Sequence, residues 1–122
     1  MEKNKVYLTS EQIVEILVIG DQDVGSIEEM GRQAYALCQQ QRSKGQRALI
    51  LDNLLLIGAV PPEGRSKVVE LIKSTEYDRL AMVGNGSLIR LGANLMLQAT
   101  GKGSKVKYFD SRDKAIEWLK AS

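Results

Sequence analysis

Residues 79–119 read RLAMVGNGSLIRLGANLMLQATGKGSKVKYFDSRDKAIEWL, and in them two short apolar runs alternate with two stretches of helical periodicity. The run at 80–83 is apolar without alternation, as is typical of a parallel strand covered on both faces. Apolar residues recur at helical spacing over Ser87–Thr100 and again over Asp113–Lys120. The run at 106–109 alternates, which favours a place near the edge of a sheet. This order predicts an α/β domain with a mostly parallel sheet.

The same pattern continues toward the N-terminus. Ala48–Leu51 is a second continuous apolar run, and helical periodicity covers Val24 to about Arg42 and Glu63–Thr75. No internal repeat, low-complexity tract or linker interrupts the chain, so we expect one domain over residues 1–122. The prediction is four helices and a five-stranded sheet with strands near residues 5–9, 12–19, 47–52, 79–84 and 105–109.

Composition excludes several classes of site. The chain has 122 residues, 43% hydrophobic and 26% charged, which is typical of a globular protein. It has one cysteine and no histidine, which excludes an internal disulfide, a multi-cysteine zinc site and any catalytic histidine. The net charge of +2 does not favour a nucleic-acid partner. Because no signal peptide or 18-residue apolar run is visible, we expect a cytoplasmic protein without a transmembrane segment. We also expect no metal and no cofactor.

Polar and glycine residues follow the predicted parallel strands, at the sheet edge where α/β domains bind ligands. In the Gly84–Ser87 loop, a dinucleotide fingerprint would need glycine or alanine where Ile89 stands, so that motif is rejected. Arg90 would suit an anion site at this loop. The competing interpretation is that these residues are helix N-caps, each contributing about 1 kcal/mol, and it is the favoured one. The candidate ligand residues at this edge are Asp52, Asn53, Gly84, Asn85, Gly86, Ser87, Asp110 and Ser111.

The segment Leu54–Val60, followed by Pro61 and Pro62, stays apolar where a loop should be polar. One interpretation is a strand extension or a loop inserted in the core. The other is the apolar lip of a pocket or a self-association patch. We expect the segment to form the apolar wall of the functional surface, with Leu54, Leu55 and Ile57 as its candidate residues.

Two single-copy residues are assigned to packing. Cys38 falls on the apolar stripe of the first long helix and is interpreted as a small core residue without a nucleophilic role. Trp118 and Leu119 are interpreted as the anchors that dock the last helix.

The stretch Arg79–Gly84 and the later stretch Val106–Leu119 resemble the C-terminal half of the SpoIIAA-like proteins. These belong to the STAS superfamily, the anti-sigma-factor antagonist fold, also described as STAS/SEC14-type domains. Ala48–Asp52 fits the central strand of that family, and the order β-β-α-β-α-β-α-β-α matches over nearly the whole chain. The resemblance implies a βα superhelix whose leading strand is antiparallel.

For the antagonists of that family, the resemblance also implies phosphorylation of a serine at the start of the helix after the central strand. The corresponding turn here is Val60–Glu63, which contains no serine, and the nearest one is Ser66. We therefore transfer the fold and not the phosphorylation site.

Three functions remain open from the sequence. The first is a non-enzymatic regulatory or ligand-binding domain whose partner is a small apolar ligand, a lipid, a protein or a second copy in a homodimer. The second is an enzyme that uses carboxylates such as Asp52 and Asp110 without histidine. The third is a nucleotide- or anion-binding module built on the Gly84–Ser87 loop.

Overall fold

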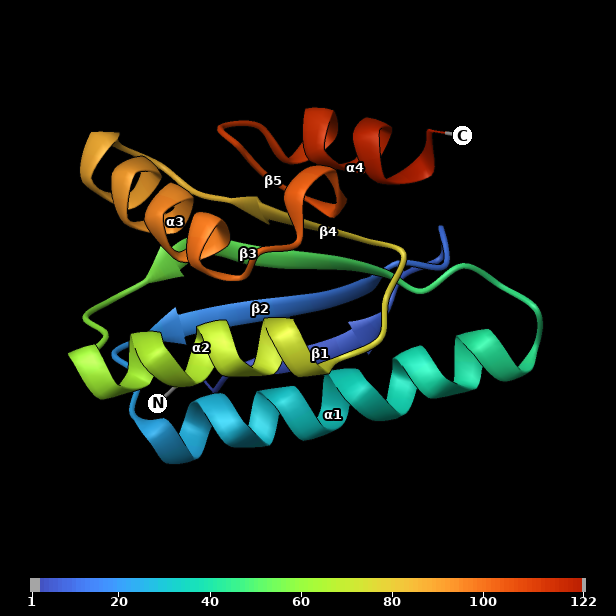
Figure 1. Ribbon diagram of the computed structural model, residues 1–122, viewed down its shortest axis with the longest axis horizontal. Helices are drawn as coiled ribbons and strands as arrows, with labels where there is room; N and C mark the ends of the chain where they lie inside the picture. Colours follow the sequence, from blue (N-terminus) through green and yellow to red (C-terminus); the bar gives the residue numbers. More distant parts are fainter. Residues whose placement is uncertain (1–2, 122) are drawn as a thin grey trace.

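The computed structural model describes residues 3–121. Five strands and four α-helices alternate in the expected order, with a short 3-10 turn at Gly103–Lys105 before the last strand (Figure 1). The elements are β1 (Lys5–Leu8), β2 (Val14–Gly20), α1 (Val24–Ser43), β3 (Leu49–Ile57), α2 (Pro62–Ser74), β4 (Arg79–Val83), α3 (Ser87–Ala99), β5 (Val106–Phe109) and α4 (Arg112–Lys120).

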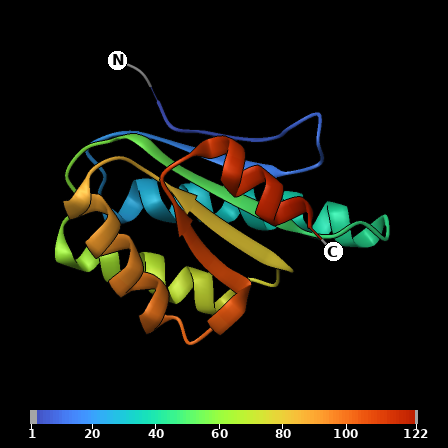
Figure 2. The ribbon, with the colours of Figure 1, turned by 90° about the horizontal axis from the view of Figure 1, so that it is seen from above.

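The strands form one sheet in the order β1-β2-β3-β4-β5. β1 pairs antiparallel with β2, and the remaining neighbours are parallel. The predicted mostly parallel sheet is therefore confirmed, and β5 lies at an edge, as its alternation indicated. The connections β2–β3, β3–β4 and β4–β5 are right-handed crossovers that step in one direction across the sheet. α1, α2 and α3 therefore fall on one face of the sheet, and α4 lies on the other (Figure 2).

The third strand is longer than the sequence predicted. It was expected to end at Asp52, but it continues to Ile57 and pairs with β2 as far as Gly20. The register shifts between Leu17 and Ile19, and an extra residue of β3 is accommodated there. β2 supplies hydrogen-bond partners along this length, and Leu54 is buried in the larger core. The Leu54–Ile57 part of the apolar segment is therefore strand, and only its end is a loop.

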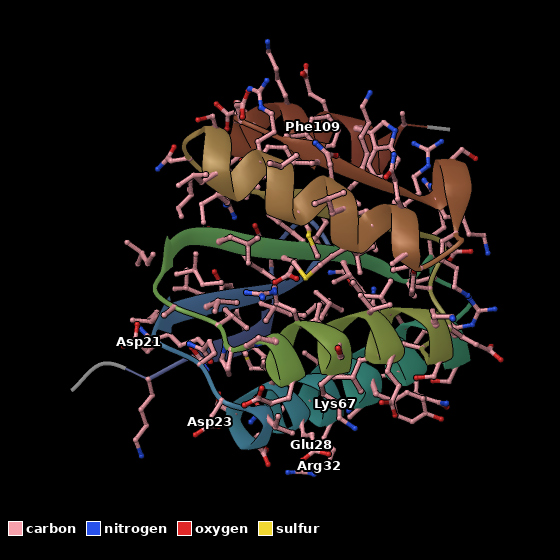
Figure 3. All side chains as sticks on the ribbon, turned by 60° about the vertical axis from the view of Figure 1, so that its left-hand side comes forward. Asp21, Asp23, Glu28, Arg32, Lys67 and Phe109 are labelled. Atoms are coloured by element: carbon pink, nitrogen blue, oxygen red, sulfur yellow. The ribbon has the colours of Figure 1, made fainter. Side chains whose placement is uncertain are left out.

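Two hydrophobic cores hold the layers together. The larger lies between the sheet and α1, α2 and α3, and the smaller lies under α4, where Leu119 is fully buried. Cys38 belongs to the larger core, and burial raises the pKa of its thiol to about 11, so it stays protonated and inert. On the outer surface, the ammonium of Lys67 on α2 lies 3.5 Å from a carboxylate oxygen of Glu28 on α1 (Figure 3).

Trp118 anchors α4 less deeply than expected. Its ring is half-buried, 5.6 Å from the Phe109 ring, and the Arg79 guanidinium lies 5.0 Å from its centroid. Leu119 is the fully buried anchor of this helix. The reason is helical geometry, because adjacent positions point about 100° apart and cannot both face the sheet.

We expect Trp118→Ala to lower the free energy of unfolding by about 1–3 kcal/mol, below the 3–5 kcal/mol typical of a fully buried ring. Trp118→Phe keeps an aromatic ring beside Phe109 and is expected to lose about half as much. Urea denaturation followed by circular dichroism measures both. An unchanged midpoint in the alanine variant would show that Trp118 does not dock the helix.

Candidate functional site

A cavity of about 330 Å³ lies between the sheet and the three helices of its larger covered face. Its floor is formed by β2, β3 and β4, and its walls by residues of α1, α2 and α3. The lining is mainly aliphatic and includes Ile16, Met30, Ile50, Leu54, Leu71 and Met96. Such a lining favours apolar groups, since apolar surface gains free energy by leaving water.

Asp52 is the one carboxyl group in the lining of this cavity. It lies on the central strand β3 between Ile50 and Leu54, and the alternation of the strand turns all three side chains to the same face. Within residues 3–121 its carboxyl group forms neither a side-chain hydrogen bond nor an ion pair. Burial raises the pKa of Asp52 from 3.8 to about 7, because the apolar surroundings disfavour the charged form.

Besides Thr75, the polar side chains that share this lining with Asp52 are Gln22, Arg65 and Tyr77. The Gln22 amide donates to the backbone oxygens of Ile19 and Gly20. Arg65 donates to the carbonyl oxygen of Val60 at 2.9 Å, in an exposed position. The Tyr77 hydroxyl is buried and lacks a hydrogen-bond partner in the described part of the chain, and burial raises its pKa to about 12. The Asp52 carboxyl is therefore not neutralised by a neighbour.

Asn53 and Leu55 lie on the opposite face of the sheet from Asp52. Asn53 donates from Nδ2 to Glu15 at 3.0 Å and accepts from the Leu55 amide at 3.0 Å, which holds the irregular part of β3. Leu55 packs against the core under α4. The sequence placed both residues at a ligand surface, but the pleat of the strand turns them to the α4 side, away from the cavity.

Glu15 is the buried acid of that opposite face. Its side chain is 2% exposed and is bound by two guanidinium nitrogens of Arg112, one of them Nε at 3.1 Å. Burial is the largest single influence and raises the pKa of Glu15, but hydrogen bonds from Arg112 and Asn53 and the Arg112 charge outweigh it and hold that pKa below its usual value. These contacts connect β2 to α4.

The predicted polar loop at Gly84–Ser87 lies in a second, more open depression with Arg90 and Asp110. Arg90 forms an ion pair with Asp110, so its charge is already neutralised there. Gly86 occupies the N-cap position of α3 with a positive φ of 86°, and no side chain caps that helix. Ser111 does cap α4 by accepting from Lys114 at 3.4 Å. The expected cap at Ser87 or Asn85 is therefore wrong, and the one at Ser111 is confirmed.

The candidate residues of the sequence therefore divide among three places. Asp52, Leu54 and Ile57 line the cavity, Asn53 and Leu55 lie under α4, and the loop residues Gly84, Asn85, Gly86 and Ser87 share the open depression with Asp110. Sequence reasoning missed the walls supplied by α1, α2 and α3. Asp52 was among the candidates, and the signal that marks it is a charged residue next to a continuous apolar run, which is unusual.

No family model matches the chain, and no curated protein matches its sequence. Among solved structures, it is similar to an uncharacterized protein of the DUF3478 family with a SpoIIAA-like fold from Shewanella loihica PV-4. The match covers 95% of this chain and 91% of the other with a TM-score of 0.60, at 15% sequence identity. The chain has a SpoIIAA-like fold. At this level of identity, the SpoIIAA-like comparison establishes the architecture alone, which agrees with the family resemblance of the sequence.

Two further properties of the SpoIIAA-like domain bear on its chemistry. None of its helices within residues 3–121 combines the length and the apolar character needed to cross a bilayer. The same residues contain no group of three or more cysteine or acidic side chains placed to hold a metal ion.

Proposed function

We propose that this SpoIIAA-like domain binds a small apolar molecule in the cavity between its sheet and α1, α2 and α3. The observation that carries the proposal is the cavity itself, whose volume of about 330 Å³ lies at the lower end of the range for small-molecule sites. Binding an apolar ligand removes the aliphatic lining from water at roughly 25 cal/mol per Å².

A binding role, as opposed to catalysis, is supported by the lack of a second acid or base beside Asp52 among residues 3–121. General acid–base chemistry needs proton donors and acceptors within hydrogen-bond reach of the reacting atoms. Of the other ionisable groups in the lining, Arg65 is committed to a backbone carbonyl, and Tyr77 has a pKa raised to about 12. Regulation by a bound ligand or a partner, including a homodimer, is consistent with the proposal.

The proposal is tested with N-phenyl-1-naphthylamine, a neutral dye whose fluorescence rises in apolar sites. We expect saturable binding to the wild-type chain. Gly92 on α3 lines the cavity, and apart from its chain neighbours and the nearby backbone of its own helix no described atom lies within 4 Å of the position of an added Cβ. Gly92→Phe is therefore expected to fill part of the cavity and weaken dye binding about tenfold or more, about 1.4 kcal/mol or more.

Gly92→Ala is the matched control. It adds a single methyl group to the helix and is expected to leave dye binding within about twofold while raising stability by about 0.5–1 kcal/mol. Wild-type protein that fails to bind the dye, or a phenylalanine variant that binds it as tightly as the alanine variant, would contradict the proposed function.

A further inference from the structure

The central strand carries an unpaired carboxyl group into the proposed ligand cavity. Asp52 lies in register with Met82 of β4, and both residues line the cavity floor. Its neighbours on the same face of β3 are Ile50 and Leu54, both buried and apolar. The Asp52 carboxyl group is partly buried among these apolar side chains and has no donor within residues 3–121, so a ligand in the cavity can supply its partner.

The groups that face Asp52 from the surrounding elements offer no substitute cation. The residues of α1 and α3 that line the cavity are apolar or glycine. α2 supplies Arg65, which is exposed and donates to the Val60 carbonyl. The loop before β4 supplies Tyr77, whose hydroxyl carries no positive charge. The burial of Asp52 is the sole cause of its raised pKa, which agrees with the lack of a nearby charge.

An ammonium group is the partner that fits this carboxylate. In a mainly apolar cavity a cation donating directly to a carboxylate forms a charge-assisted hydrogen bond, about twice as strong as a neutral one. The aliphatic walls then bury the rest of the molecule. We propose that the cavity takes a primary amine on a short apolar body, with its ammonium group bound by the carboxylate of Asp52; this inference rests on the proposed function.

The test compares three ligands of equal chain length as competitors of N-phenyl-1-naphthylamine at pH 8. We expect octylamine to displace the dye at a concentration at least tenfold lower than octanol. Octanoate is expected to be the weakest competitor, because its carboxylate would be placed beside a second negative charge. A preference for octanoate would assign the polar contact to Arg65 and overturn the inference.

Asp52→Asn keeps the shape of the side chain and removes its charge. In this variant octylamine and octanol are expected to compete equally, each compared with the dye affinity measured for the same variant. Tyr77→Phe removes a buried hydroxyl group of the lining that has no hydrogen-bond partner within residues 3–121, and it is the matched control, for which the wild-type amine preference is expected. An amine preference that survives in Asp52→Asn would show that Asp52 does not bind the amine.

The pH dependence gives an independent readout. An alkylammonium keeps its proton below about pH 10, like lysine, so the group of the cavity lining expected to titrate near neutrality is Asp52. Octylamine affinity is expected to fall about tenfold for each pH unit below about 7, as Asp52 takes up its proton, and octanol affinity is expected to stay constant. A flat amine profile would overturn the inference. If the dye does not bind at all, the proposed function fails; if it binds without amine preference, only the inference fails.

Discussion

Replacing Arg112 by alanine is expected to lower the free energy of unfolding by about 2–4 kcal/mol near pH 7. The substitution leaves Glu15, whose side chain is 2% exposed, without its cation. Removing one partner of a fully buried pair typically costs about 3–5 kcal/mol. The expected loss is smaller here because the Arg112 side chain is 40% exposed, so water can enter the space it leaves.

The remaining contacts of Glu15 do not replace the guanidinium. Asn53 donates one hydrogen bond to Glu15, and the Tyr7 hydroxyl also interacts with it. Neither group carries a compensating positive charge. Urea denaturation at pH 7, followed by circular dichroism, measures the loss.

The control is the double variant Glu15→Gln/Arg112→Ala, in which no buried charge is left alone. We expect it to recover at least half of the loss, and a double variant as unstable as Arg112→Ala would contradict the assignment. The Glu15–Arg112 pair contributes fully to the free energy of unfolding above the unfolded pKa of glutamate, about 4.3. That contribution is lost as the pH falls through the lowered pKa of folded Glu15. The difference between wild type and Arg112→Ala is therefore expected to shrink toward pH 3.

The second large effect concerns Asp52 and has the opposite pH dependence. Its folded pKa, raised to about 7, lies above the ordinary value of 3.8. Between these two values the native state binds more protons than the unfolded state, so the stability that Asp52 allows falls as the pH rises. At about 1.4 kcal/mol per pH unit, the full change is about 4 kcal/mol, and we expect about 3–4 kcal/mol between pH 4 and pH 8.

Asp52→Asn isolates this contribution because the amide does not titrate. The variant is expected to gain about 3–4 kcal/mol relative to wild type between pH 4 and pH 8. This change with pH does not depend on the constant cost of burying the amide. Denaturation curves for both proteins at several pH values measure it. Parallel curves would mean that water or a donor stabilises the carboxylate, and the amine inference would lose its physical basis.

The charge of Asp52 also links the stability of the wild-type protein to ligand binding. A site that holds an unpaired acid gives up stability in the free protein and recovers it when a ligand supplies the partner. We therefore expect octylamine to raise the thermal midpoint of the wild-type chain more at pH 8 than at pH 5.

The sequence by itself determined the element order of this protein. Continuous apolar runs at Ala48–Leu51 and Leu80–Val83 are typical of strands covered on both faces, and 3.6-residue periodicity located the four helices. It also limited the chemistry, because a chain without histidine and with one buried cysteine has few groups that titrate near neutrality. These are local or compositional properties, and they do not depend on which elements meet.

The extent of β3 and the place of each site residue were decided only by the tertiary structure. Leu54 and Leu55 are neighbours of similar character, yet one lines the cavity and the other packs under α4, since consecutive strand residues face opposite sides. The same pleat separates Asp52 from Asn53. Arg112 meets Glu15 across 97 positions of the chain, and α1, α2 and α3 close the cavity from three separate crossovers. Such contacts depend on how distant segments pack, and no local pattern of residues encodes them.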